Sequence, residues 1–393
     1  MTAIPKNNTR RQLMASGLAS SLAPSVALTA AGFAGPARAA SRQPGLVEPS
    51  APRLRIAFGS CARQDKPQPI WQAIAAKKPD LFLFLGDNFY ADARDEATLR
   101  QRYAEFRAVK PLQDFRRATP HLAIWDDHDF GDDDVGADYA LRRLSQQLFC
   151  DEWAEPADSP RRSRSGIYES YRFKCAGKTV QLIMLDLRFN RSPLVADPAL
   201  QESYHAMVQR AQRSGKPMKG WYVPNPDPAA TLLGAEQWAW LEQQLREPAD
   251  VRLIGSSVQF AAEGSGWEGW TNFPLERQRL LRLIADTRAE GVVFLSGDMH
   301  YAELSSWEQG AAYPLWDITS SGLTEVWEIP TPNSQRRSAV LAERNFGLVD
   351  IELGGSESQL RLSICDVEGR QRLSQTLALS ALKFPAEQAA KKG

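Results

Sequence analysis

Short apolar runs alternate with helical segments over the first third of the chain. The runs are Leu54–Phe58, Leu81–Leu85 and Leu122–Trp125, and between them helices are expected at about Pro69–Lys77 and Asp95–Arg117. An apolar run without alternation is the pattern of a strand that is buried on both faces. The order strand, helix, strand, helix, strand is typical of a largely parallel sheet covered by helices. An α/β fold is therefore expected.

The pattern changes further along the chain. An antiparallel pair is expected at Ile167–Phe173 and Thr179–Leu185, and the Pro- and Gly-rich residues 192–233 are expected to form an insertion with a helix in its middle. The last third turns to β structure. The remaining expected elements are helices at Ala137–Trp153, Ala235–Leu245 and Leu275–Glu290, and strands at Val251–Gly255, Val292–Leu295, Leu315–Ile318, Phe346–Glu352, Gln359–Cys365 and Leu373–Leu379.

Four of the apolar runs end in side chains that can bind metal ions. They are Cys61 after the first run, Asp87 and Tyr90 after the second, Asp126 to Asp129 after the third, and Asp298 with His300 after Val292–Leu295. Ligands gather at the carboxyl edge of parallel strands, so we expect these four ends to converge on a site for two or three ions. Thiolate and phenolate suit a transition metal such as iron(III), and carboxylates suit calcium or another hard divalent ion.

The acidic stretch after the third run has a simpler alternative, because an acidic cluster can also be a solvated loop. We expect Asp126–Asp129 to belong to the site, and Asp132, Asp133 and Asp134 to form only its solvated shoulder. The chain contains four histidines, fewer than a conventional dinuclear centre needs, and His121 and His205 are expected to be structural.

The charge balance of the chain limits the classes of partner that are expected. The 393 residues contain 47 Lys plus Arg and 47 Asp plus Glu, a balance that gives no support for a nucleic-acid partner. Of the four cysteines, Cys61 is expected to be a ligand. Cys150 and Cys175 bracket an arginine-rich loop and could close it with a disulfide, which would leave Cys365 unpaired.

The first forty residues are typical of an export signal. Arg10-Arg11 precede an Ala-, Leu- and Ser-rich segment, and Ala37-Arg38-Ala39 is a possible cleavage site. The paired arginines favour the twin-arginine export machinery, which carries folded proteins, over an ordinary secretory signal. We expect a linker at 41–52, one domain at 53–384, a tail at 385–393, and a periplasmic or secreted monomer. No later run is apolar for long enough to span a bilayer.

Six motifs together resemble one family. GSC, GDNFYAD, WDDHD, LDLRFNR, SGDMH and TSSGL, between Ile56 and Leu323, have the order and spacing of the alkaline phosphatase D (PhoD-type) metallophosphoesterases, a branch of the calcineurin-like phosphoesterase superfamily. The resemblance implies a two-sheet αββα sandwich, a centre of iron(III) and calcium, and export in folded form. It also implies hydrolysis of phosphodiesters, with monoesters accepted, through in-line attack of a metal-held hydroxide.

The same resemblance implies a role for each matching residue. The metal ligands that it implies are Cys61, Tyr90 and His300 for iron, Asp87 as the carboxylate shared by both metals, and Asp127 with Asp298 for the second metal. His128 would stabilise the phosphoryl oxygens or protonate the leaving oxygen, and Arg188 would contact a phosphate oxygen. The chain departs from the family where it has Asp129 in place of Glu, and Trp267-Glu268-Gly269-Trp270 in place of Trp-Asp-Gly-Tyr.

Two other functions stay open at this point. A strict phosphomonoesterase or a phospholipase-D-like lipid phosphodiesterase would use the same centre on a small phosphate-ester or phospholipid-like substrate. A non-catalytic calcium-binding surface protein would need neither the Cys61 thiolate nor the Tyr90 phenolate, so these two residues argue against it.

Overall fold

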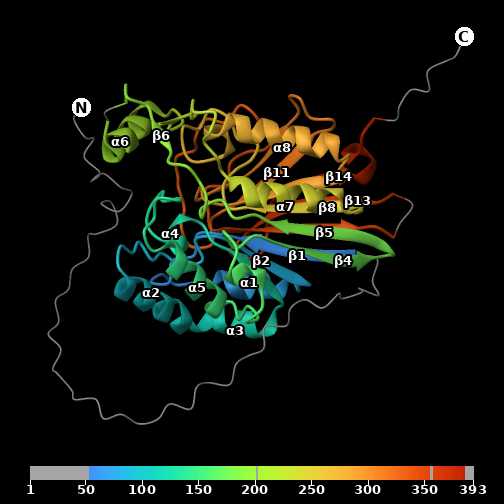
Figure 1. Cartoon of the computed structure of the whole chain (residues 1–393), viewed down its shortest axis with the longest axis horizontal. Helices are drawn as coiled ribbons and strands as arrows, with labels where there is room; N and C mark the ends of the chain where they lie inside the picture. Colours follow the sequence, from blue (N-terminus) through green and yellow to red (C-terminus); the bar gives the residue numbers. More distant parts are fainter. Residues whose placement is uncertain (1–52, 201, 355–356, 386–393) are drawn as a thin grey trace, which may run out of the picture.

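Two six-stranded sheets pack face to face between outer layers of helices (Figure 1). The computed structural model describes residues 53–200, 202–354 and 357–385. The predicted export signal and linker lie outside these ranges. The arrangement is the expected αββα sandwich, and the core lies between the two sheets and beneath the helices.

The first sheet has the strand order β14-β13-β12-β1-β2-β3. Its strands are β1 Arg53–Gly59, β2 Leu81–Leu85, β3 His121–Ile124, β12 Asn345–Glu352, β13 Gln359–Asp366 and β14 Gln371–Ala378. The strands β1, β2 and β3 run parallel, with Ile56 opposite Leu81 and Phe82 opposite His121, as the apolar runs predict. The helices that cover this sheet are α1 Ile70–Ala76, α2 Glu96–Ala108, α3 Lys110–Ala118 and α5 Arg142–Glu152 (Figure 1).

The second sheet has the order β10-β11-β9-β8-β5-β4. Its strands are β4 Glu169–Cys175, β5 Lys178–Met184, β8 Val251–Ser256, β9 Val292–Ser296, β10 Ala302–Trp307 and β11 Leu315–Ser320. The four inner strands are parallel, and β4 and β10 are antiparallel edges. The outer layer over this sheet consists of α7 Gly234–Arg246 and α8 Pro274–Asp286 (Figure 1).

The insertion contains its own small elements beside this sheet. These are β6 Val195–Ala196, α6 Tyr204–Ser214 and β7 Tyr222–Val223. The remaining short segments are α4 Asp127–Phe130 and the 3-10 turns Pro160–Arg162, Trp270–Asn272 and Leu379–Leu382. Within the described ranges, no helix has both the length and the apolar character that a bilayer crossing requires.

Three expectations about local structure are wrong. The single helix at Asp95–Arg117 is two helices, because Pro111 cannot donate a backbone hydrogen bond and fits only the first turn of α3. Strand β10 was not predicted, because its polar residues are buried; Glu303, for example, is fully buried and ion-paired with Arg336. The helix expected from Ala137 begins only at Arg142.

The possible disulfide between Cys150 and Cys175 is not formed. All four cysteines are buried and free. The Sγ atom of Cys150 lies 3.4 Å from the carbonyl oxygen of Arg161, and that of Cys175 lies 4.0 Å from the carbonyl oxygen of Ile351. The two thiols therefore pack against different parts of the fold.

Candidate metal centre

The four polar strand ends meet at one edge of the sandwich. Backbone hydrogen bonds fasten the turn after β1 to the turn after β2, since Ala62 donates to the carbonyl oxygen of Asp87 at 2.8 Å. The loop after β11 is tied to the same turn, because Thr324 donates to the carbonyl oxygen of Cys61 at 3.0 Å. The neighbouring turns therefore form one rigid edge.

The backbone at this edge is unusually strained. Ten non-glycine residues of the described ranges have a positive φ, and six of them lie in the loops that follow these strands. The six are Cys61, Asp87, Asp92, Asp134, Asp298 and His300. Non-glycine residues in the left-handed region cost of order 1–3 kcal/mol each, and such residues cluster at functional sites.

Two glycines allow the turns to approach this closely. Gly86 has a φ of +100°, and a Cβ at this position would lie 2.4 Å from the Cβ of Asp126. A Cβ at Gly297 would lie 2.4 Å from the Oγ of Ser60, which connects the turn after β9 with the turn after β1. Gly86 in the GDNFYAD motif thus lets the turns after β2 and β3 meet within the first sheet, and Gly297 in the SGDMH motif lets turns of the two sheets pack closely.

One group of possible ligands contains a thiol, a carboxylate, a phenol and an imidazole. One atom each of Cys61, Asp87 and His300 lie within 4.8 Å of one another, and all three residues are buried. The Tyr90 hydroxyl lies 3.0 Å from His300 Nε2 and 3.5 Å from Asp87 Oδ2. The Cys61 thiol lies 3.4 Å from the same Asp87 oxygen. The structure brings together all four residues expected on the iron side.

A second group shares one of these residues. One ligand atom each of Asp87, Asp127 and His128 lie within 4.8 Å of one another. Asp127 Oδ2 also accepts a hydrogen bond of 2.7 Å from the backbone N–H of Asp134. Because Asp87 belongs to both groups, its carboxylate lies where a bridging ligand would be needed.

Asp298 is close to the centre but is not a member of either group. Its residue is buried, and its backbone carbonyl oxygen lies 3.7 Å from the Cys61 Sγ atom. Its role as a ligand of the second metal stays a prediction.

Burial and mutual repulsion make this centre strongly unfavourable for negative charge. Burial, together with the carboxylate of Asp127, raises the pKa of Asp87 well above its ordinary range. Burial raises the pKa of Asp126 to about 6, although Arg188 lowers it, and burial raises the pKa of Asp129 to about 7. Burial and nearby anionic groups likewise raise the pKa values of Cys61 and Tyr90 well above their usual range.

The residues present fit bound cations. The Oδ1 atom of Asp87 is buried and has no hydrogen-bond partner among the described residues. The site offers sulfur, phenol, imidazole and carboxylate donors around this oxygen. Cations would replace the protons that the raised pKa values indicate, since a bound metal deprotonates its ligands.

His128 is held between two carboxylates. Its Nδ1 atom lies 2.6 Å from Asp92 Oδ1, and its Nε2 atom lies 3.8 Å from Asp133 Oδ1. Burial opposes protonation of the ring, but the charges of Asp127, Asp87 and Asp92 outweigh it and raise the pKa of His128 well above its ordinary value. The sequence reasoning assigned no role to Asp92, although it closes the GDNFYAD motif.

The expectation of a solvated shoulder after α4 is wrong, because each of the three aspartates has a structural contact. Asp132 is buried and pairs with Arg94 at 2.6 Å. Asp133 faces His128, and the backbone of Asp134 holds Asp127. The loop therefore closes around the centre.

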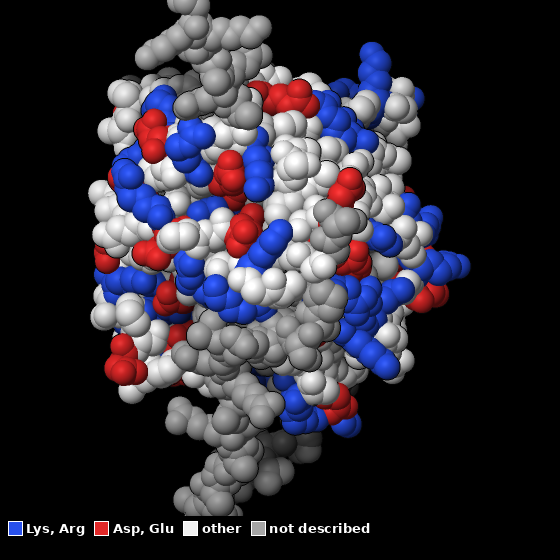
Figure 2. All heavy atoms as spheres, turned by 90° about the vertical axis from the view of Figure 1, so that its right-hand side faces the viewer, with Lys and Arg blue, Asp and Glu red and all other residues white. Residues whose placement is uncertain are grey.

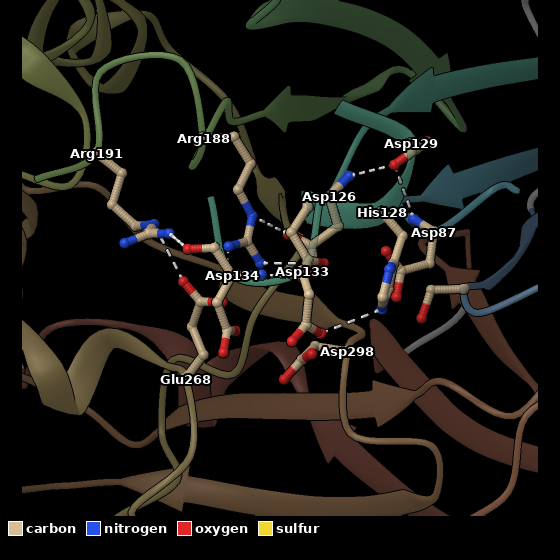
Figure 3. A network of polar contacts seen from close by, with 12 residues as sticks. Asp87, Asp126, His128, Asp129, Asp133, Asp134, Arg188, Arg191, Glu268 and Asp298 are labelled. Atoms are coloured by element: carbon tan, nitrogen blue, oxygen red, sulfur yellow. Dashed lines mark hydrogen bonds and ion pairs between the residues drawn. The ribbon is translucent and has the colours of Figure 1, made fainter. Parts of the chain in front are cut away.

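Arg188 belongs to a buried network of charges that includes Asp126 and Glu268 (Figure 3). Its side chain is fully buried, with Nε 2.5 Å from Asp126 Oδ1 and Nη1 2.6 Å from Glu268 Oε2. Its Nη2 atom lies 3.7 Å from Asp127 Oδ1. The two carboxylates thus accept from Nε and Nη1, and the expected contact of Arg188 with a phosphate oxygen stays a prediction.

The other two histidines lie outside both ligand groups. His121 Nδ1 lies 2.9 Å from the carbonyl oxygen of Thr119, and burial lowers its pKa to about 4. His205 is exposed on α6, with Nε2 2.7 Å from the side-chain nitrogen of Gln209.

A curated protein of known name is similar in sequence to this chain. Alkaline phosphatase D of Bacillus subtilis (strain 168) is 24% identical over 322 residues, which cover 69% of this chain and 52% of that protein. The chain thus spans about half the length of the curated relative that it matches.

Solved structures share the fold. One described as the structure of PhoD has a TM-score of 0.61 at 18% identity and covers 87% of this chain and 73% of its own. The purple acid phosphatase PPD1 from yellow lupin (Lupinus luteus) seeds has a TM-score of 0.55 at 12% identity, with 84% and 54% covered. Both confirm the two-sheet sandwich.

A family model described as PhoD-like phosphatase matches residues 56–345, from β1 to the start of β12. This range includes every strand end of the candidate centre and most of the chain. The resemblance inferred from the six motifs is confirmed, and the chain belongs to the PhoD-like phosphatase family.

Proposed function

We propose that this protein is an exported, metal-dependent phosphoesterase that hydrolyses phosphodiesters and also accepts monoesters. The observation that carries the proposal is the pair of ligand groups that share Asp87. Enzymes that catalyse displacement at phosphorus commonly use two cations a few ångströms apart, and one carboxylate can bind both of them. A calcium-binding surface protein would not need the buried Cys61 thiol and Tyr90 phenol.

Each side of the centre suits a different ion. Cys61, Tyr90 and His300 offer the soft and anionic donors that favour iron(III), while Asp127 and Asp298 offer oxygens that suit calcium. When bound, the two cations would lower the pKa of a water molecule and neutralise the phosphoryl oxygens. Asp87 would contact both cations, since it belongs to both groups of possible ligands.

His128 is the proposed catalytic residue. Asp92 Oδ1 accepts from Nδ1, and Nε2, which lies 3.8 Å from Asp133 Oδ1, would face the reacting ester. A proton held on Nε2 can stabilise a phosphoryl oxygen or pass to the leaving alcohol. Asp92 fixes the ring orientation and favours its protonated form. Arg188 remains the proposed phosphate contact on the side of Asp127.

A second candidate substrate is an ester whose leaving alcohol is apolar or aryl. The Trp327 ring lies edge-on to His300, with 5.8 Å between the ring centroids. Trp267 and Tyr204 pack against Trp327 in a cluster that includes α6 of the insertion. A lipid-like or aryl diester would place its apolar part against such a wall.

The remaining proposals concern location and partners. Arg10-Arg11 and the apolar segment that follows support export through the twin-arginine machinery to the periplasm or beyond. We propose a monomer acting on a small ester. Figure 2 shows the face on the right of Figure 1, where basic and acidic side chains are interspersed, and this mixture gives no support for a nucleic-acid partner.

The test combines elemental analysis of the purified protein with hydrolysis of aryl phosphodiesters and monoesters. We expect iron together with a divalent ion, and a faster rate on the diester. A faster rate on the monoester would instead favour a strict phosphomonoesterase. A protein without transition metal that hydrolyses neither ester would contradict the proposal.

A further inference from the structure

Glu268, in the tryptophan-rich loop between β8 and α8, joins two buried arginines. Its Oε2 atom lies 2.6 Å from Arg188 Nη1, and its Oε1 atom lies 3.1 Å from Arg191 Nε. The three side chains are 3%, 0% and 1% exposed, respectively, so water does not screen these contacts. Figure 3 shows Glu268 below the two guanidinium groups, both of which come from the LDLRFNR motif.

Arg188 and Arg191 each connect Glu268 to the carboxylate of Asp127. On one path, Arg188 Nη2 lies 3.7 Å from Asp127 Oδ1. On the other path, Arg191 donates to the carbonyl oxygen of Asp134 at 2.5 Å, and the N–H of Asp134 donates to Asp127 Oδ2 at 2.7 Å. Asp127 Oδ1 therefore faces a charge from Arg188, and Oδ2 accepts a hydrogen bond from the segment that Arg191 holds, so both oxygens are connected to one glutamate.

The network also reaches the insertion. Tyr222, on β7, donates from its hydroxyl to Asp134 Oδ2. Its backbone N–H donates to the carbonyl oxygen of Gly266 at 2.7 Å, two residues before Glu268. The insertion and the tryptophan-rich loop therefore hold the same segment that carries Asp127.

We propose that Glu268 is a positioning residue for Asp127 and thereby sets the affinity of the centre for its second cation. The inference rests on the proposed function, because it takes Asp127 as a ligand of that cation. Without the charge of Glu268, the buried guanidinium groups of Arg188 and Arg191 would have too few carboxylates to balance their positive charge. Unbalanced charge is costly where water cannot solvate it. The arginines would then rearrange, and Asp127 would lose its orientation on both paths.

The test is calcium binding rather than turnover. Iron-loaded protein is titrated with Ca²⁺ by calorimetry, while iron content and the absorption of the iron–thiolate pair report on the other side. We expect Glu268→Gln, which keeps the shape and removes the charge, to raise the Kd for Ca²⁺ by about 10- to 100-fold. Iron content and absorption should stay unchanged. Glu268→Asp should restore part of the affinity.

Glu155 provides a matched control. It pairs with the buried Arg161 at 2.5 Å, with side chains that are 12% and 2% exposed, and Arg161 otherwise donates to the backbone oxygens of Ala123 and Ile167. Glu155→Gln should lower thermal stability in the same way as Glu268→Gln and leave calcium binding as in the wild type. If Glu268→Gln does not fold, Tyr222→Phe, which removes only the hydrogen bond to Asp134, should weaken Ca²⁺ binding a few-fold.

Three results would overturn the inference. One is wild-type Ca²⁺ affinity in Glu268→Gln, or in Tyr222→Phe if that variant stands in for it. Another is an equal loss of affinity in Glu268→Gln and Glu155→Gln, since it would show a general loss of stability. If the wild type itself binds no second cation, the two-cation centre of the proposed function fails, and the inference fails with it.

Discussion

The two sides of the candidate centre are held in place by different means. The side with Cys61, Tyr90 and His300 depends on backbone: Cys61 and His300 have φ values of +64° and +58°, and main-chain hydrogen bonds join the turns. The side with Asp127 depends on charge, through Arg188 and the network behind it. One side should therefore be sensitive to a change of chain geometry, and the other to a change of charge.

Asp87 is the one residue that both sides need, so its removal should have the largest effect. Asp87→Asn keeps the size of the side chain but removes the charge shared by the two ligand groups. We expect loss of both metals and a fall of roughly a thousandfold or more in kcat/KM. Elemental analysis and diesterase assays measure this. Retention of either metal at full occupancy would show that Asp87 is not shared.

His128 should be the residue on the charged side that serves the substrate. His128→Gln should lower kcat by about 100- to 1,000-fold while both metals stay bound. Asp92→Asn, which alters only the partner of Nδ1, should lower kcat by roughly tenfold. Single-turnover rates measure the chemical step, and metal content shows whether both cations stay bound. Loss of the second metal in His128→Gln would instead make His128 a ligand, a role that its distance from Asp87 and Asp127 also permits.

Gly297→Ala should disturb mainly the side that depends on backbone geometry. The new methyl group would lie 2.4 Å from Ser60 Oγ, so the turns carrying Cys61 and His300 must separate. We expect a loss of about 1–3 kcal/mol in the free energy of unfolding and weaker iron binding, with a smaller loss of calcium binding because Asp298 lies on the same turn but Asp127 does not. Thermal denaturation and metal analysis measure both effects. The control is Gly310→Ala, where a Cβ meets nothing within 4 Å and only its φ of +71° causes strain.

His121 should affect stability without affecting either side. Burial lowers its pKa to about 4, so between pH 4 and about 6.5 the unfolded chain binds a proton that the folded chain does not. Its contribution is therefore complete above pH 6.5 and is lost as the pH falls toward 4, by at most roughly 3 kcal/mol.

The variant His121→Gln isolates this contribution. Its melting temperature should fall less steeply than that of the wild type between pH 6.5 and 4.5. Metal content at pH 7 should be the same in both proteins. An identical pH dependence in the two proteins would show that His121 already binds its proton in the folded state.

Much of the fold could be read from local patterns. The runs Leu81–Leu85 and Val292–Leu295 are so uniformly apolar that only a central strand can bury them, and both are central strands. Strand β10 could not be found in this way, because it buries Glu303 against Arg336, which is contributed by a loop more than thirty residues away. Burial of a paired charge leaves no apolar pattern.

The candidate site also contains residues that sequence patterns could locate and contacts that they could not. Sequence alone placed Cys61, Asp87, Tyr90 and His300 at strand ends. The ends of the neighbouring parallel strands β1 and β2 share an edge, whereas His300 follows β9 of the second sheet and joins them only through the packing of the two sheets. Sequence alone could not find the contact of Asp92 with His128, or the link from Glu268 through two arginines to Asp127. These contacts join segments whose separation along the chain has no fixed relation to their separation in space.

The sequence by itself determined an α/β pattern and the residue types at the strand ends, because apolar periodicity and strand-end motifs are local properties. The family, and the two-sheet architecture that it implies, followed from the resemblance of the six motifs. Only the tertiary structure decided which side chains share Asp87, that the aspartates after Asp129 close around the centre, and that Arg188 is held by Asp126 and Glu268. The physical reason is that the pairing of buried charges depends on distances of a few ångströms between distant segments, which packing alone sets.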